Sequence, residues 1–177
     1  MRKFILILFL WAGTLFAGTH TSPSNMFNYD EWAAFNIELL QDEDKIVTIN
    51  WQGDGGYLSI LFRFEEVIQA LHINNQLVHF NLVGNSFSAQ ASSVCLADSI
   101  VWNGYFIMFH APIFLNDSSR RLAIKEIEGV YKINQQCIDK GILTLDLMQQ
   151  SLIDKEVYVG SPRPGVYRFI MKEDNRI

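Results

Sequence analysis

Hydrophobic and polar residues along this chain fall into short blocks that predict strands and one long amphipathic helix. Between positions 57 and 71, apolar residues recur every three or four positions, which is the spacing of a helix that packs one face on a sheet. Four shorter apolar blocks are bounded by polar or turn-forming residues, which is typical of buried strands. They lie at 46–51, 76–83, 99–102 and 105–110. The order of these elements predicts an α/β fold whose parallel strands are joined by right-handed crossovers.

The flanking segments carry weaker patterns. Residues 32–40 fit a strand or a helix, and their place before the first core strand suggests an edge element of the sheet. Helical spacing returns at 120–139 and again at 143–152. A charged, then apolar segment at 153–160 and a terminal strand or extended tail at 166–171 complete the chain.

The first residues are typical of an export signal. A basic start precedes an apolar run at 4–17, which is shorter than the roughly 20 residues that a membrane span needs. We therefore expect a cleaved signal peptide at 1–17, with an uncleaved signal anchor or a buried N-terminal helix as alternatives. Polar residues at 18–28 predict a linker, and 29–177 a single domain. The sequence thus predicts an exported protein, periplasmic or secreted.

Composition is that of a globular protein and limits the partners. The 177 residues are about one domain's worth, with 49% hydrophobic and 19% charged residues. The formal net charge of −5 argues against nucleic acid as a main partner, because phosphate binding needs clustered Lys and Arg.

Three segments supply the groups of an acyl-transfer site. Gly84 permits a sharp turn at the end of a strand, and the small residues and short helix that follow place Ser88 near a helix N-terminus. A glycine-rich turn lies at 53–56, and His110 ends a strand. A serine on such a turn, a histidine and free backbone N–H groups are the groups that nucleophilic acyl transfer requires.

In their order and spacing, these segments resemble the Clp protease proteolytic subunit and its relatives, which include signal peptide peptidase A and phage head-maturation proteases. The likeness covers residues 45–112 well and residues 125–160 weakly. The motifs that carry it are Gly53-Asp54-Gly55-Gly56, Gly84-Asn85-Ser86-Phe87-Ser88, Leu96-Ala97-Asp98 and Met108-Phe109-His110-Ala111-Pro112.

The resemblance implies a serine-type endopeptidase that works without a cofactor or metal. It makes Ser88 the nucleophile and His110 the general base, with the backbone N–H groups of Gly56 and Ala89 in the oxyanion hole. The acid that orients the histidine falls on Glu156, with Asp154 as the fallback.

The resemblance also implies an architecture and a set of partners. It predicts stacked βαβ units of the Clp protease/crotonase type with a helical arm used in homo-oligomer contacts. The substrate would be a peptide or protein, and an exported enzyme would have no ATPase partner.

Two residues depart from the family pattern. Phe87 stands where a small residue precedes the nucleophile, so its ring is expected to crowd the turn or reshape the pocket. Gln90 stands where the family has Gly or Ala, so the helix is expected to pack differently. These departures keep a second hypothesis open, a catalytically inactive binding or assembly module of the same fold. A crotonase-type acyl-CoA enzyme is a third, which the pairing of Ser88 with His110 disfavours.

The remaining cysteines and histidines are expected to be structural. Cys95 and Cys137 would form one disulfide in an exported protein, but the place of Cys95 on a predicted helix favours a buried free thiol. His72 and His79 have no cluster of metal ligands around them in the sequence, so no metal site is predicted.

Overall fold

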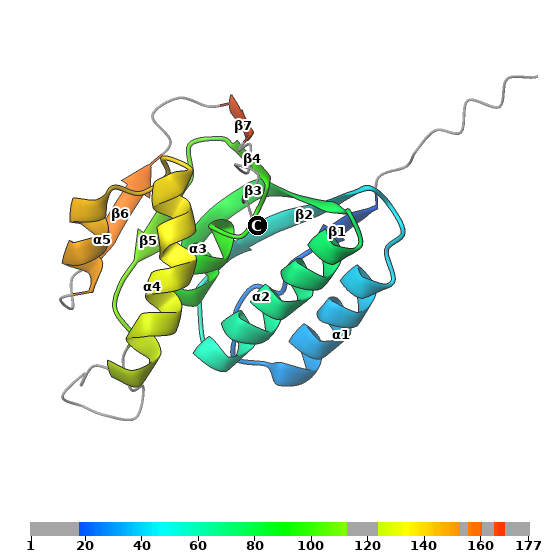
Figure 1. The fold of residues 1–177 in the computed structure, drawn as a ribbon, viewed down its shortest axis with the longest axis horizontal. Helices are drawn as coiled ribbons and strands as arrows, with labels where there is room; N and C mark the ends of the chain where they lie inside the picture. The colour runs from blue at the N-terminus through cyan, green and yellow to red at the C-terminus, as the bar shows by residue number, and fades with distance from the viewer. Residues whose placement is uncertain (1–17, 113–123, 153–155, 161–164, 169–177) are drawn as a thin grey trace, which may run out of the picture.

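The computed structural model of the chain describes residues 18–112, 124–152, 156–160 and 165–168. These residues form an α/β fold in which five helices accompany one mixed sheet of seven strands (Figure 1). Helices and strands alternate through the first half of the chain, as the hydrophobic pattern predicts. In chain order the elements are β1 (Thr19–Thr21), α1 (Tyr29–Leu40), β2 (Ile46–Gly53), α2 (Leu58–Ile73), β3 (Leu77–Phe87), α3 (Ser88–Val94), β4 (Ser99–Trp102), β5 (Phe106–Phe109), α4 (Ile124–Asp139), α5 (Leu145–Ser151), β6 (Val157–Gly160) and β7 (Gly165–Arg168).

Parallel strands form the centre of the sheet. They lie in the order β1-β2-β3-β4, and β7 adds antiparallel to β4. The long strand β3 pairs with β4 along its first half and with β5 along its second half, both parallel. Strand β6 adds antiparallel to β5. The carboxyl ends of β2, β3 and β5 therefore point in the same direction, and in α/β folds this is where functional groups gather.

A stack of aromatic rings joins the sheet to its first two helices. Trp51 of β2 and Phe80 of β3 stack with ring centroids 4.5 Å apart, and Phe64 of α2 stacks on Trp51 at 5.2 Å. Trp32 of α1 meets Phe64 edge to face at 5.5 Å. All four side chains are buried, so this stack is the centre of the hydrophobic core. Figure 1 shows α1 and α2 side by side on one face of the sheet.

The predicted strands and the amphipathic helix are confirmed. The blocks at 46–51, 76–83, 99–102 and 105–110 correspond to β2, β3, β4 and β5. The helix predicted at 57–71 is α2, and its apolar positions face the core. Its buried residues are Ile60, Leu61, Phe64, Val67, Ile68 and Leu71.

The sharp turn predicted at Gly84 is wrong. Strand β3 continues through Gly84 to Phe87, and the chain turns at Ser88 instead. A Cβ on Gly84 would lie 2.3 Å from the side-chain oxygen of Gln52 on the neighbouring strand. The glycine therefore lies inside β3, beside the Gln52 side chain, and does not end the strand.

The edge element predicted at 32–40 is a helix, not part of the sheet. The Asn28 side chain accepts hydrogen bonds from the backbone N–H groups of Asp30 and Glu31 and so caps the start of α1. The buried residues follow at helical spacing, Trp32, Phe35 and Leu39.

The segment 18–28, predicted to be a linker, instead pairs with the sheet. Thr19 pairs with Thr48 at the start of β1, and Met26 forms a further parallel bridge with Gly56. The segment lacks the apolar pattern of a strand because two of its buried side chains, His20 and Ser22, are polar. Backbone hydrogen bonds, such as that from the Ser22 N–H to the Asn50 carbonyl, join it to β2.

Two helices follow β5, as predicted for 120–139 and 143–152. Helix α4 lies across α3 in Figure 1, and α5 begins at Thr144, whose hydroxyl accepts from the backbone N–H of Leu147. The strands expected near 153–160 and 166–171 are β6 and β7. The role of these helices in oligomer contacts stays a prediction.

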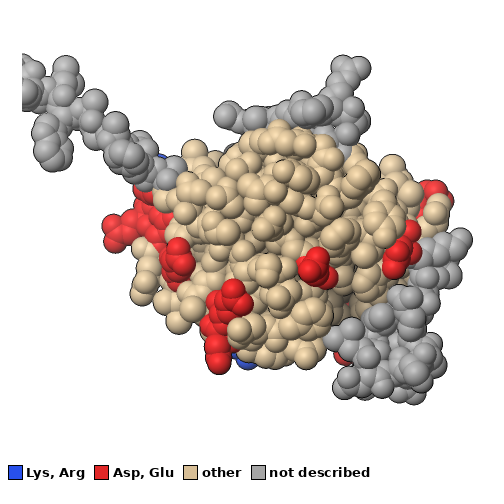
Figure 2. All heavy atoms as spheres, turned by 180° about the vertical axis from the view of Figure 1, so that it is seen from behind, with Lys and Arg blue, Asp and Glu red and all other residues tan. Residues whose placement is uncertain are grey.

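The signal peptide predicted at 1–17 lies outside the described residues. Within the described residues, no helix combines the length and apolarity needed to cross a bilayer. Figure 2 shows one face of the molecule, on which the described residues carry scattered acidic side chains and very little basic surface.

Candidate functional site

The candidate site is built around the junction between β3 and α3. Phe87 is the last strand residue and Ser88 is the first helix residue, so the chain changes direction within one residue. Ser88 has a φ of +57°, and only Asn75 shares a positive φ among the described residues other than glycine. A non-glycine residue in this region costs free energy, and such residues concentrate at functional sites. Ser88 thus occupies the strained turn on which nucleophiles are commonly presented.

The glycine-rich turn after β2 packs against this serine. Gly55 has a φ of +86°, and a Cβ built on it would lie 2.5 Å from the Cβ of Ser88 and 3.1 Å from its Oγ. Real Cβ atoms do not approach so closely, so only glycine fits here. The sequence likeness singled out Gly56, whereas a Cβ on Gly55 is the one that would meet Ser88 and a Cβ on Gly56 would meet Met26.

Two backbone donors lie next to the serine. The N–H groups of Gly56 and Ala89 have no hydrogen-bond acceptor among the described residues. Met26 bonds to the residues on both sides of Gly56: its N–H donates to Gly55, and its carbonyl accepts from Tyr57 at 2.8 Å. In a parallel bridge this directs the Gly56 N–H away from Met26. Ala89 is in the first turn of α3, where backbone N–H groups have no partner within the helix.

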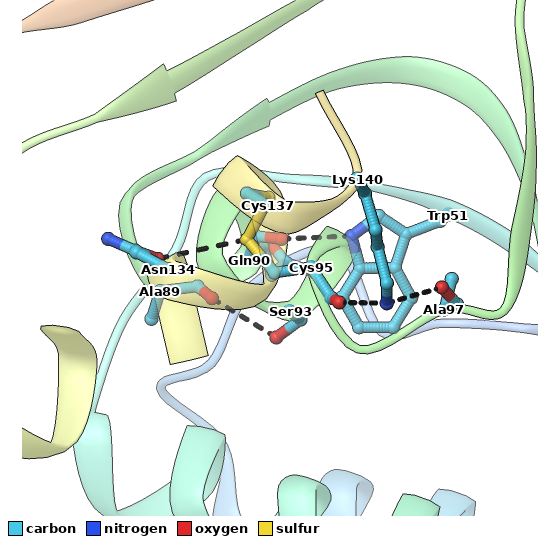
Figure 3. Close-up of a disulfide and its surroundings, with 9 residues drawn as sticks. All are labelled: Trp51, Ala89, Gln90, Ser93, Cys95, Ala97, Asn134, Cys137 and Lys140. Carbon is cyan, nitrogen blue, oxygen red and sulfur yellow. Dashed lines mark hydrogen bonds between the residues drawn. A yellow bond between two sulfur atoms is a disulfide. The ribbon is translucent and has the colours of Figure 1, made fainter. Parts of the chain in front are cut away.

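Gln90 holds the glycine-rich turn in place. Its side chain is fully buried, and its Nε2 donates to the carbonyl oxygens of Pro23 at 2.7 Å and Gln52 at 2.9 Å. Its Oε1 accepts from the N–H of Gly55 at 3.2 Å. The long amide thus reaches from α3 to the glycine-rich turn. The Gln90 carbonyl also accepts from the Trp51 indole N–H at 3.1 Å (Figure 3).

Phe87 lies in the strand immediately before the turn. It pairs with Met108 on β5 and is half-buried, whereas its neighbour Ser86 is fully buried. Because side chains alternate along a strand, the ring lies on the opposite face of the sheet from Ser86. The strand therefore accommodates the Phe87 ring, which the sequence pattern had indicated as an obstruction.

His110 directly follows β5, and Ser88 directly follows β3, the strand that pairs with β5. The last pair of these two parallel strands is Phe87 with Met108, so both residues lie beyond the same end of the pair. The His110 Nδ1 lies 2.7 Å from the carbonyl oxygen of Ala111. A carbonyl only accepts, so Nδ1 carries the proton and Nε2 of the neutral ring is an acceptor, as a general base requires.

Glu156 directly precedes β6, and His110 directly follows β5. Phe109 pairs with Val157 in antiparallel register, so the two residues adjoin the same pair at one end of the sheet. The Glu156 carboxylate nevertheless accepts from the Tyr158 hydroxyl at 2.9 Å, and this hydrogen bond raises the pKa of Tyr158. Asp154, the fallback acid, lies outside the described residues.

The predicted groups lie at the same end of the sheet, directly after β3, directly after β5 and directly before β6. Among the described residues, no hydrogen bond links Ser88, His110 and Glu156 to one another. Sequence reasoning named Gly55 only within the glycine-rich turn and Gln90 only as a departure in helix packing. Nothing in the sequence pointed to the hydrogen bond of Tyr158 with Glu156.

The prediction of a free thiol at Cys95 is wrong. Cys95 caps the C-terminus of α3 and forms a disulfide with Cys137 of α4, with Cα atoms 4.7 Å apart (Figure 3). The 42-residue separation gave no sign of the pairing, which depends on α4 packing on α3. The bond fixes α4 to the helix that Ser88 begins.

Lys140 strengthens the same junction. Its Nζ donates to the carbonyl oxygens of Cys95 and, at 2.8 Å, of Ala97 (Figure 3). Burial lowers the pKa of Lys140 to about 8, against the opposing attraction of Asp98 and Asp139. The ammonium group therefore caps the carbonyls at the end of α3.

His72 has a structural partner. Its Nε2 lies 2.9 Å from the Asp98 carboxylate, which also accepts from the N–H of Val78 at 2.7 Å. Burial alone would raise the pKa of Asp98, but these two hydrogen bonds outweigh it and lower the pKa. No group of three or more His, Cys, Asp or Glu side chains within the described residues could hold a metal ion.

No protein-family model matches this chain, and no curated protein matches it either.

Proposed function

We propose that this protein is an exported serine-type endopeptidase with a fold of the Clp protease/crotonase type. The observation that carries the proposal is the strained backbone of Ser88 at the end of a central parallel strand, with Gly55 packed against it. A structural serine at a helix start needs neither feature. The parallel strands β1 to β4 and their connecting helices support the architecture.

In the proposed reaction, the Ser88 Oγ attacks the peptide carbonyl carbon while the His110 Nε2 accepts its proton. The negative charge that develops on the carbonyl oxygen is stabilised by the N–H groups of Gly56 and Ala89. His110 then donates the proton to the leaving amine. Water hydrolyses the resulting ester by the same steps in reverse, and Glu156, or Asp154, orients the imidazole and stabilises its charged form.

The disulfide supports export, because disulfides persist in oxidising compartments and are rare in the cytosol. We infer that the enzyme acts there on peptides or unfolded proteins as a homo-oligomer, without an ATPase partner and without a cofactor. Helices α4 and α5 would provide the oligomer contacts.

A specific observation favours the second candidate, an inactive binding or assembly module. Among the described residues, His110 and Glu156 bond to Ala111 and Tyr158 rather than to each other. A module that only binds would have no need of the contact between them.

Hydrolysis of a fluorogenic peptide library, measured together with peptide binding, separates the two functions. The peptidase predicts turnover that is lost in Ser88→Ala while peptide binding is retained. Ser86→Ala is the matched control, because it removes a buried hydroxyl two residues away that has no partner among the described residues. Binding without turnover in the wild-type protein would favour the module.

A further inference from the structure

Glu156, directly before β6, and Tyr158 of β6 form a hydrogen bond on the surface. Glu156 and Tyr158 are two residues apart, so both side chains project from the same face. The Tyr158 hydroxyl donates to the Glu156 Oε2 at 2.9 Å, although 55% of the Tyr158 surface is exposed to solvent. The carboxylate is therefore engaged by a neighbour two residues along the chain.

His110, which Glu156 would orient, also has a hydrogen-bond partner of its own. His110 and Glu156 adjoin the same pair, Phe109 with Val157, yet the His110 Nδ1 donates to the Ala111 carbonyl. Both bonds are made by side chains, one to a hydroxyl and one to a carbonyl. A contact between His110 and Glu156 requires these two bonds to be exchanged.

We propose that Tyr158 is a positioning residue that holds the Glu156 carboxylate away from His110 and so keeps the acid and the base apart. The proposal rests on the proposed function, in which Glu156 acts through His110. The balance is small in energy, because an exposed hydrogen bond replaces hydrogen bonds to water and so contributes little net free energy. A bound substrate that shields the site from water would favour the exchange, since charged hydrogen bonds strengthen when water is excluded.

The proposal predicts the direction in which loss of the Tyr158 hydroxyl shifts the pKa of His110. A free Glu156 carboxylate that turns to His110 stabilises the protonated imidazole and raises the pKa of His110. A purely structural hydroxyl on an exposed strand would leave that pKa unchanged. A hydroxyl that instead helps Glu156 to reach His110 would lower the pKa of His110 when it is removed.

The test is an NMR titration of His110 in the full chain, comparing wild type with Tyr158→Phe. Tyr131→Phe is the matched control, since it removes an exposed tyrosine hydroxyl on α4. The proposal predicts a higher titration midpoint for His110 in Tyr158→Phe, no change in Tyr131→Phe, and loss of the rise in Tyr158→Phe combined with Glu156→Gln. An unchanged or lower midpoint in Tyr158→Phe would overturn it.

A kinetic measurement keeps this result separate from the proposed function. The rate at which a fluorophosphonate phosphonylates Ser88 is expected to increase by about twofold or more in Tyr158→Phe. If wild type and variant both fail to react, the peptidase function fails, while the titration of His110 still decides whether Tyr158 controls Glu156. If both react at the same rate and the midpoint is unchanged, the role of Tyr158 fails and the peptidase function stands.

Discussion

Gly55 and Ser88 pack so closely that a single methyl group on the glycine would overlap the serine side chain, with 2.5 Å between the two Cβ atoms. Gly55 follows β2, Ser88 begins α3 directly after β3, and each has a positive φ. The strained backbone of Ser88 is thus held against a turn whose positive φ glycine adopts without strain. This mutual fit is the structural basis of the proposed active site.

Substitution of Gly55 tests that fit. Gly55→Ala is expected to lower the free energy of unfolding by about 3 kcal/mol or more and to abolish the reactivity of Ser88, because it adds a steric overlap to backbone strain. Gly104→Ala is the matched control: its φ of +87° is nearly the same, but no atom lies within 4 Å of the added methyl group. Its expected cost is about 1 kcal/mol. Equal losses in urea denaturation would show that the packing against Ser88 contributes nothing.

Gln90 is expected to be as important to the fold as an apolar core residue. Gln90→Ala leaves the buried N–H of Gly55 and the carbonyl of Pro23 without their partner, at a cost of about 2–4 kcal/mol. Gln69→Ala, on the exposed surface of α2, removes a hydrogen bond to Glu65 and should change stability by less than about 0.5 kcal/mol. Urea denaturation of both variants measures the difference. A loss at Gln90 no larger than at Gln69 would contradict the role assigned to its amide.

The hydrophobic pattern predicted the central strands and α2 because each buries one face, and burial leaves a periodic trace. The turn at Ser88 has no such periodic pattern in the sequence. The turn was predicted at Gly84, which lies inside β3 next to the Gln52 side chain of another strand. The disulfide and the contact of Tyr158 with Glu156 likewise depend on helix packing and on local side-chain geometry. The resemblance assigned Ser88, His110 and Glu156 to one predicted site. The hydrogen-bond partners of His110 and Glu156 could not be predicted from the sequence.

The disulfide is expected to stabilise the fold mainly through the unfolded chain. Closing a loop of 42 residues predicts a contribution of about 4 kcal/mol at most. Replacement of both cysteines by alanine should lower the free energy of unfolding by up to that amount, and a reductant should then have no further effect. The measurement is urea denaturation with and without dithiothreitol. Equal stability of the oxidised wild-type protein and the double variant would contradict the prediction.

His20 should make stability depend on pH near neutrality. Burial alone lowers the pKa of His20, but hydrogen bonds to Asp42 and Glu38, both 2.7 Å, outweigh burial and raise it. A raised pKa in the folded state stabilises the protein fully below the ordinary value of 6.5, and this contribution is lost as the pH rises through the raised pKa.

The matched variants for this prediction are Asp42→Asn and Glu43→Gln. Each removes one negative charge, but only Asp42 contacts His20, and Glu43 is exposed. Chemical denaturation between about pH 6 and about pH 8 should show that Asp42→Asn flattens the fall in stability while Glu43→Gln preserves it. The same slope in both variants would show that the contact of His20 with Asp42 does not set the pH dependence.

Fluorophosphonate labelling of the purified protein, with the labelled residue identified by mass spectrometry, tests the central claim most directly. The reagent phosphonylates only an activated serine, so one adduct on Ser88 is expected. It should be absent in Ser88→Ala and retained in Ser86→Ala. Absence of labelling in the folded wild-type protein, or an adduct on another serine, would contradict the assignment of Ser88 as a nucleophile.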